Sequence, residues 1–218
     1  MTKKILKFAA IGILAIALTN CKDKAQEAET TTAEETAETT AVSTKYKVDT
    51  GNSTIMWKGF KPTGTHTGTI AIENGVFTMN GDAIESGTFL IDMSSITVTD
   101  IPVEDEGNAK LTGHLKSDDF FHVEEYPSSA FEVTAFEMKD GQAMLSGNLK
   151  MKDATNNITI PVTVNENGNT VTIVSDKFSI DRSKWNIKYG SKSFFDDLGD
   201  KFINDDMELQ ITVSANKA

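Results

Sequence analysis

From Tyr46 to the C-terminus, apolar and polar residues alternate in short runs. Residues 142–152 place Ala, Leu, Gly, Leu and Met on one face and mostly polar residues on the other, and residues 157–165 and 207–213 repeat this pattern. A period of two is typical of β-strands that have one buried and one wet face. Roughly eight to ten such strands can be counted, and sequential antiparallel strands of this kind form a barrel or a sandwich.

Turn signals separate the predicted strands. Asn74-Gly75, Asn80-Gly81, Asp140-Gly141 and Asn167-Gly168 are each typical of tight hairpin turns. Pro161 lies in the middle of a predicted strand. Because proline has no N–H to donate, we expect that strand to be an edge, to be bulged, or to hold the proline nitrogen outside the hydrogen-bonded ladder.

Residues 106–125 interrupt the alternation. Leu111 and Leu115 stand at helical spacing within this stretch, which predicts one short helical insertion. We expect Phe120 and Phe121, which follow the helical part, to close one side of the barrel. The fold class predicted from the residues is therefore all-β with one small helical excursion.

The N-terminus has the pattern of an export signal. Three lysines among the first seven residues precede an apolar run of 11 residues, from Phe8 to Leu18. A membrane-spanning helix needs about 20 apolar residues, so the run is typical of a signal peptide. Leu18-Thr19-Asn20-Cys21 resembles a bacterial lipobox, in which the thiol is acylated and the signal is cut just before it. The alternative is that Cys21 is a free thiol in an ordinary secretory peptide.

Charge and cysteine content narrow the function classes. The chain has 32 acidic and 21 basic residues and a net charge of −11, which becomes −14 if residues 1–20 and their three lysines are removed. So acidic a chain is not expected to bind nucleic acid, which requires clustered Lys and Arg. Cys21 is the only cysteine. The fold therefore cannot depend on disulfides and needs a hydrophobic core.

Residues 22–44 differ in composition from the rest of the chain. They are rich in Thr, Glu and Ala, with one valine and no aromatic residue. Because such a segment has little apolar surface to offset the entropy of ordering, we expect a disordered tether, with a short helix as the alternative. The expected organisation is a signal peptide at 1–20, a lipid anchor and tether at 21–44, and a barrel domain at 45–218.

Several short motifs occur in a characteristic order along the predicted domain. They are Tyr46-Lys47-Val48-Asp49, His66-Thr67-Gly68-Thr69, Ile91-Asp92-Met93-Ser94-Ser95-Ile96, the block from His114 to Phe121, Gly147-Asn148-Leu149, and Phe194 to Gly199 followed by Asp200. Together they resemble the YceI-like family over about residues 45 to 216. The resemblance implies an antiparallel lipocalin-like barrel of about eight strands that binds polyisoprenoid or other amphiphilic lipids.

The chain also differs from the family pattern at two places. Leu111-Thr112-Gly113 replaces a frequent Arg-Asp before the His-Leu pair, and Asn156-Asn157 stands where Thr-Arg or Thr-Lys is common. In addition, Asn148 replaces the aspartate of Gly-Asp-Leu. The differences at residues 111–113 and 156–157 leave open whether a polar head group is held as in other members.

The resemblance implies that inward apolar residues line a lipid cavity. An eight-stranded barrel is just wide enough to be filled by side chains or to hold one narrow ligand. For each residue, simple packing in the core is the alternative. Arg182 is expected to pair with a carboxylate at the barrel end rather than to face a head group. The candidate lipid-binding residues are Phe77, Phe89, Ile91, Phe120, Phe131, Val133, Leu145, Leu149 and Ile173.

Motifs for catalysis are missing from the sequence. It has no G-x-S-x-G elbow, no H-E-x-x-H pair and no second cysteine. His114 and His122, with two aspartates between them, could be drawn as a metal site, but helix-surface and capping roles explain them as well. We therefore expect a protein that is not an enzyme and that needs no metal or cofactor.

Two hypotheses remain for the function. The first is an envelope lipoprotein whose barrel binds an isoprenoid or fatty amphiphile, for storage or transport. The second is a non-catalytic interaction lipoprotein with a filled barrel that docks to an envelope partner. Lys22 follows the cysteine, and in the familiar enterobacterial sorting code an aspartate there would mark inner-membrane retention. The predicted location is therefore the outer membrane, facing the periplasm or the cell surface.

Overall fold

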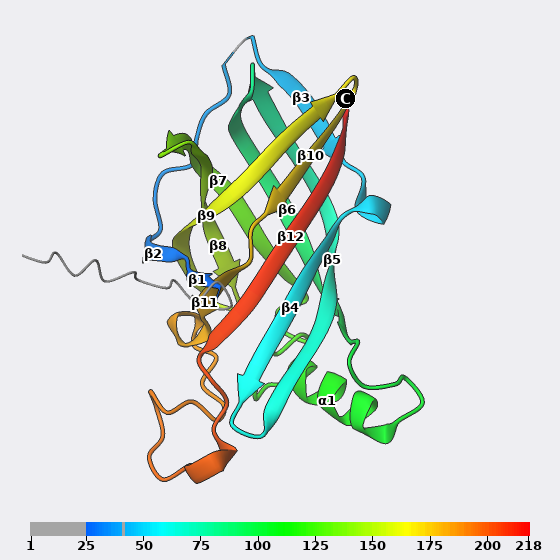
Figure 1. Ribbon diagram of the computed structural model, residues 1–218, viewed down its shortest axis with the longest axis vertical. Helices are drawn as coiled ribbons and strands as arrows, with labels where there is room; N and C mark the ends of the chain where they lie inside the picture. Colours follow the sequence, from blue (N-terminus) through cyan, green and yellow to red (C-terminus); the bar gives the residue numbers. More distant parts are fainter. Residues whose placement is uncertain (1–24, 41) are drawn as a thin grey trace, which may run out of the picture.

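Eight antiparallel strands close into a ring in the computed structural model, which describes residues 25–40 and 42–218 (Figure 1). The ring closes because β4 pairs with both β5 and β12, which confirms the predicted all-β fold, although the barrel is irregular. Its strands are, in order, β4 (Thr54–Lys61), β5 (Gly64–Asn80), β6 (Ala83–Val98), β7 (Ser128–Lys139), β8 (Gln142–Met151), β9 (Ala154–Asn167), β10 (Thr170–Ser175) and β12 (Asp206–Lys217).

Two further strands extend this ring. β3 (Thr44–Val48) precedes β4 and pairs with β12 and β5, and the 3₁₀ turn η1 (Thr50–Asn52) joins it to β4. β11 (Phe178–Asp181) follows β10 and continues its pairing with β12. Figure 1 shows the β5–β6 and β9–β10 hairpins and the C-terminus at the upper end of the ring, and the β4–β5 hairpin and α1 at the lower end.

Three of the four predicted hairpin turns are confirmed. Gly81, Gly141 and Gly168 have φ values of 58°, 82° and 63°, a conformation that glycine adopts readily. Asn74-Gly75 is not a turn, because it lies inside β5 beside an irregularity in the pairing with β6. A Cβ at Gly75 would lie 2.6 Å from Val48 Cγ2, so glycine is needed here for close packing and not for chain reversal.

The helical insertion is confirmed as α1 (Glu106–Lys116). Its N-cap is Asp105, whose carboxylate accepts a hydrogen bond from the Gly107 N–H at 2.7 Å. Two 3₁₀ turns, η2 (Arg182–Trp185) and η3 (Gly199–Lys201), lie in the long connection from β11 to β12. Like α1, this connection lies at the lower end of the ring (Figure 1).

The upper part of the ring is filled by aromatic side chains. Tyr46 stacks on Phe77 with 5.4 Å between ring centroids, and Phe77 stacks on Phe89 at 5.9 Å. Phe77 is 1% exposed. Such offset stacks fill space efficiently, so little volume remains at this end.

The predicted disordered tether is wrong for the part of it that the structure describes. Within residues 25–40, β1 (Gln26–Glu27) pairs parallel to β11, and β2 (Glu29–Thr32) pairs antiparallel to β9. Ala28, between these strands, is buried, and its N–H donates to the Ser179 carbonyl at 2.8 Å. We call residues 25–40 the N-terminal arm. Cys21 and the predicted signal peptide lie outside the described residues.

The N-terminal arm fills a break in the ring at Pro161. Pairing of β9 with β10 begins at Val162, whereas its pairing with β2 ends at Thr159. Pro161 lies between the two ladders, and its carbonyl accepts a hydrogen bond from Asp176 N–H at 3.1 Å. Because proline cannot donate, a ladder is naturally interrupted here, and the lower part of β9 is left for β2 to cover.

A buried amide holds the next part of the N-terminal arm. The Asn148 side chain accepts from the Glu34 N–H at 2.9 Å and donates to the Glu34 carbonyl at 2.7 Å, while Asn157 donates to the Asn148 oxygen at 3.1 Å. Aspartate, which the resembled family carries at this position, could not donate to that carbonyl. Hydrogen bonds to the sheet thus order the arm, although its residues provide little apolar surface.

Docking of the N-terminal arm should contribute to stability. Ala28→Asp would bury a carboxylate between β11 and β9, so we expect it to release the arm and to cost about 1–3 kcal/mol of unfolding free energy. In thermal unfolding this is a loss of several degrees. Ala33→Asp, at an exposed position of the same arm, is the matched control and should leave the melting temperature unchanged. Equal melting temperatures for both variants would mean that the arm adds no stability.

Candidate ligand-binding cavity

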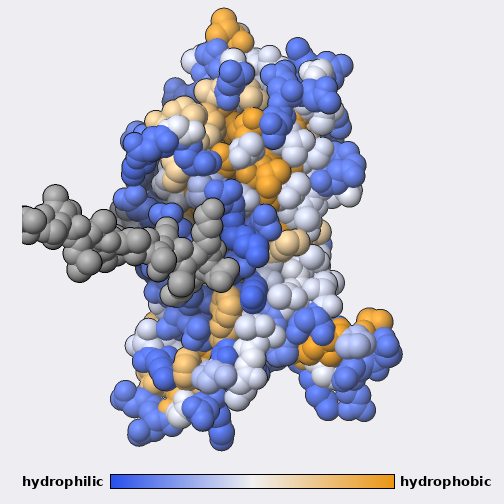
Figure 2. Space-filling model, viewed as in Figure 1, coloured by the Kyte–Doolittle hydropathy of each residue, from blue (hydrophilic) through white to orange (hydrophobic). Residues whose placement is uncertain are grey.

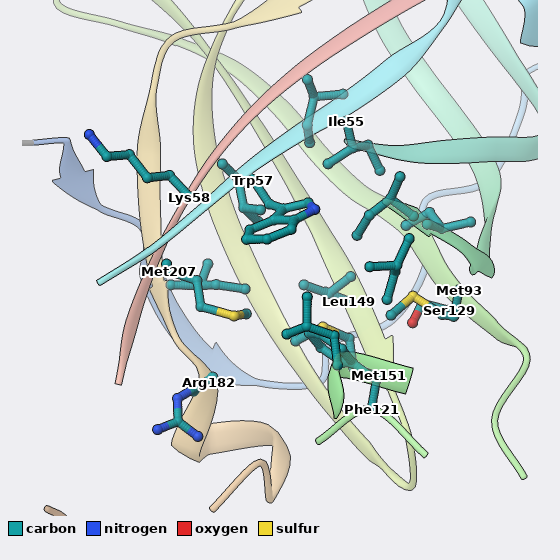
Figure 3. Close-up of a pocket in the computed structure, with 18 of the residues that line it drawn as sticks. Ile55, Trp57, Lys58, Met93, Phe121, Ser129, Leu149, Met151, Arg182 and Met207 are labelled. Atoms are coloured by element: carbon teal, nitrogen blue, oxygen red, sulfur yellow. The ribbon is translucent and has the colours of Figure 1, made fainter. Parts of the chain in front are cut away.

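The lower half of the ring encloses a cavity of about 400 Å³. This volume falls within the range of about 300–1,000 Å³ that is usual for ligand pockets. Inward-facing side chains of the ring strands line it, and most of them are apolar. Figure 3 shows Ile55, Trp57, Leu149, Met151 and Met207 gathered around the space. The cavity exists because the aromatic stack that fills the upper half does not continue downward.

Seven of the nine predicted lipid-binding residues line this cavity. Phe77 and Val133 do not line it and pack elsewhere in the core, where each is about 1% exposed. Contact of any of the nine with a lipid stays a prediction. The seven lining residues are Phe89, Ile91, Phe120, Phe131, Leu145, Leu149 and Ile173.

Sequence reasoning missed many lining residues. Those on β12 share the alternation that identified this strand, so the same pattern could have found them. Tyr189 and Ile203 come from the connection between β11 and β12, where no periodic pattern exists. Lining residues on the strands that were not predicted include Ile55, Trp57, Ile70, Ile72, Met93, Met151, Ile158, Ile160, Met207, Leu209 and Ile211.

One wall of the cavity is shaped by a glycine. A Cβ at Gly147 on β8 would lie 2.3 Å from the Phe131 ring, so the ring lies flat over this residue. Phe131 also contacts Phe89, with 6.3 Å between ring centroids. Because Gly147 has no side chain, the Phe131 phenyl group can lie flat against the barrel wall.

The mouth of the cavity is at the lower end. The His114 ring on α1 meets the Tyr189 ring edge to face, with 4.5 Å between centroids, so the helix and the β11–β12 connection touch across the opening. Asn204 N–H donates to the Phe60 carbonyl at 2.8 Å, which ties the same connection to the end of β4. Phe120 and Phe121 are buried and line the cavity below β8, as expected of residues that close this side.

Apolar side chains are also exposed near this end. Phe194 and Phe195 are about half exposed, and Val103, in the loop before α1, is 86% exposed. Figure 2 shows that this face of the molecule is largely hydrophilic, with apolar groups at the protruding loop beside α1 and a second apolar patch in the upper half. Exposed apolar side chains also occur within strands, at Met56 of β4, Val76 of β5 and Met138 of β7.

Arg182 has a structural role, as predicted. Its fully buried guanidinium donates to the carbonyls of Ile187, Ile203 and Asn204 at 2.7–3.1 Å and lies 3.2 Å from an Asp205 carboxylate oxygen. Burial lowers the pKa of Arg182, and the neighbouring carboxylates of Asp205 and Asp181 act in the opposite direction. All three guanidinium nitrogens are occupied, so Arg182 fixes the β11–β12 connection and is not available to a ligand.

The two indoles differ in how their N–H groups are satisfied. The Trp185 N–H donates to the Leu149 carbonyl at 2.8 Å, deep in the core. The Trp57 N–H is buried and has no hydrogen-bond partner among the described residues. A Cβ at Gly68 would lie 2.5 Å from the Trp57 ring, so this indole packs flat against β5. The Trp57 ring therefore forms part of the cavity wall and brings to it one buried donor without a partner in the described residues.

His66 and Asp100 form a hydrogen-bonded pair beside the mouth. His66 Nδ1 lies 2.9 Å from one Asp100 oxygen, and the Thr67 N–H donates to the other at 2.8 Å. Burial acts to raise the pKa of Asp100, but these two hydrogen bonds outweigh it and hold the pKa below the ordinary value of an aspartate. The pair joins the start of β5 to the loop after β6.

His114 and His122 do not share a partner. His114 lies 3.6 Å from Asp119 and His122 lies 3.3 Å from Glu125, so the two histidines have separate partners. Within residues 25–40 and 42–218, no three metal-ligating side chains come together. No helix in the described part of the chain is long and apolar enough to cross a membrane.

Comparisons with known proteins identify the family. The YceI-like domain matches residues 46–215, and the chain belongs to this family. BcnA of Burkholderia cenocepacia shares its fold, with a TM-score of 0.56 and 21% identity over 78% of this chain and 99% of BcnA. A polyisoprenoid binding domain from Saccharophagus degradans, implicated in plant cell wall breakdown, has a TM-score of 0.56 and 12% identity over 79% of this chain and 98% of that one. No curated protein matches the chain.

The depressed pKa of Asp100 predicts a pH effect on stability. Ionised Asp100 stabilises the fold above its unfolded pKa of about 3.9, and this contribution is lost as the pH falls through the lower folded value. Asp100→Asn should therefore lower the free energy of unfolding, measured by urea denaturation, by at most about 1 kcal/mol at pH 7 and by less at pH 3. Asp140→Asn, in an exposed turn, is the control and should follow the unmodified protein at both pH values. An equal loss for Asp100→Asn at both pH values would contradict this assignment.

Proposed function

We propose that the barrel binds one isoprenoid or fatty amphiphile and buries its chain in the cavity. The observation that carries this proposal is the apolar cavity of about 400 Å³ with its mouth at the lower end of the ring. The family assignment and the fold shared with a polyisoprenoid binding domain support the same class of ligand. Storage or transport of such a lipid in the cell envelope would follow from binding alone.

Burial of the chain is sufficient to retain the ligand. Each methylene removed from water contributes about 0.8 kcal/mol, so a chain of moderate length offsets the cost of association without any catalytic group. The lining provides several methionines, among them Met93, Met151 and Met207, whose flexible thioethers adapt to irregular apolar shapes. We infer a binding protein and not an enzyme.

The rival hypothesis is an interaction lipoprotein that docks to an envelope partner and has a filled barrel. The cavity of about 400 Å³ favours the lipid-binding hypothesis, because a filled barrel would leave no such space. The exposed Phe194 and Phe195 at the mouth would suit a docking surface as well as a lipid portal. The two hypotheses therefore differ in whether protein from cells contains a lipid.

The proposed location rests on the sequence before the described residues. The apolar run from Phe8 to Leu18 and the lipobox-like Leu18-Thr19-Asn20-Cys21 support export, cleavage and acylation of Cys21. Lys22 supports the outer membrane as the destination. The barrel would then work while attached to the membrane through its N-terminus.

Lipid binding can be tested with two valine variants of the full chain. Protein purified from cells should yield a nearly stoichiometric amphiphile by organic extraction and mass spectrometry. Val162→Phe places a larger side chain in the cavity lining and should expel this amphiphile while the barrel stays folded. Val171→Phe overpacks a core position outside the lining and should cost about 1–3 kcal/mol in stability without lowering the lipid content of the folded protein.

Each result of this comparison has a clear meaning. Added isoprenoid or fatty acid should raise the melting temperature of the stripped protein and of Val171→Phe, but not that of Val162→Phe. Native protein that yields no amphiphile and gains no stability from either lipid would exclude the lipid-binding function and favour the docking protein.

Membrane attachment should depend on one sulfur atom. Cys21→Ala removes the only thiol in the chain, so the exported protein should move from the membrane fraction to the soluble fraction on cell fractionation. Metabolic labelling with a palmitate analogue should mark the unmodified protein and not the variant. Soluble, unlabelled wild-type protein would contradict the proposed anchor.

A further inference from the structure

Apart from Tyr189, the ionisable side chains that line the cavity are all basic. None of the aspartates and glutamates that the structure describes lines it, although acidic residues outnumber basic ones by 32 to 21 in the whole chain. The basic lining residues are Lys58, Lys61, His66, His114, Arg182 and Lys201.

Most of these six side chains already have partners or point away. Arg182 is occupied by three carbonyls and Asp205, and His66 and His114 each lie beside an aspartate. The Lys58 amine points away from the cavity (Figure 3) and lies 5.2 Å from the centre of the Phe60 ring. The cations that remain are the ammonium groups of Lys61 and Lys201.

Lys61 and Lys201 lie on two neighbouring segments that border the mouth. Alternation along β4 puts Lys61, its last residue, on the same face as Ile55 and Trp57, which line the cavity. Lys201 is the last residue of η3. The hydrogen bond from Asn204 to Phe60 holds the two segments together. Both lysines are exposed, and neither forms an ion pair within the described part of the chain.

This arrangement suits a ligand with a negatively charged end. An apolar chain would fill the space between the strands, and its head group would remain at the wet mouth, where it need not lose its hydration. Two ammonium groups at that position attract a carboxylate or a phosphate, and no acidic lining residue opposes them. A neutral head group gains nothing from these charges.

We propose that the amphiphile carried by the barrel is anionic, a fatty carboxylate or a prenyl phosphate, and that Lys61 and Lys201 select its charged head group. This inference rests on the proposed lipid-binding function and adds the ligand class to it. Recognition is electrostatic, so the two lysines position the head group and the apolar cavity supplies most of the affinity.

The test compares ligands that share a chain and differ in charge. Delipidated full-length protein is titrated with palmitate and hexadecanol, and with geranylgeranyl phosphate and geranylgeraniol, at low and at high salt. The unmodified protein should prefer the anionic member of at least one pair by about three- to tenfold, as expected for two exposed ion pairs, and salt should reduce this preference. The pair that shows the larger preference distinguishes a carboxylate from a phosphate.

Lysine variants assign the preference to the mouth. The double variant Lys61→Gln with Lys201→Gln should lose the preference for the anionic ligand while binding the neutral ligand as before. Lys150→Gln removes an exposed lysine of β8 that lies outside the cavity lining, and it should keep the preference. Melting temperatures without ligand show whether each variant is folded.

The outcomes separate this inference from the function on which it rests. Equal affinity of the unmodified protein for anionic and neutral ligands, or a preference that survives the double substitution, would overturn the role of the lysines and leave lipid binding intact. Failure of all four ligands to bind would overturn the proposed function itself.

Discussion

Closure of the hydrogen-bonded sheet is the constraint on which the remaining structure depends. A strand whose backbone groups face no partner costs free energy when it is buried and invites foreign strands when it is exposed. The ring satisfies this requirement except where β9 separates from β10 at Pro161. The N-terminal arm completes the ladder there, with β2 against β9 and β1 against β11. The barrel wall is thus made from two parts of the chain that are far apart in sequence.

The closed ring also explains why a cavity is present. Its circumference is set by the backbone, so the side chains decide how much of the interior is filled. Tyr46, Phe77 and Phe89 fill the upper part with stacked rings. In the lower part, Phe131 lies flat over Gly147, and Phe120 and Phe121 close the side without entering the middle. An interior that is packed at one end and open at the other suits a ligand with one apolar and one polar end.

Alternation of side chains predicted the strands well, because a period of two follows directly from the geometry of a half-buried strand. It could not separate Phe77 from Phe89, since both face inward and only their height in the ring decides which borders the cavity. Asn74-Gly75 looked like a turn because the same dipeptide serves close packing and chain reversal. The N-terminal arm was missed because its order comes from an open edge elsewhere in the fold, and from Asn148, which no local composition reveals. The lysines at the mouth come together only through the β11–β12 connection, which has no periodic signal.

The docked N-terminal arm has a consequence for the reach of the barrel. If Cys21 is acylated and inserted in the membrane as proposed, only five peptide units separate this anchor from Gln26, where pairing with β11 begins. A chain of this length spans at most about 18 Å even when fully stretched. The barrel is therefore confined close to the lipid surface. The half of the ring that contains the cavity is the half nearest the attachment point. A tether this short keeps the local concentration of the cavity mouth at the bilayer high. Lipid exchange with that membrane would therefore be favoured over movement of the protein across the envelope.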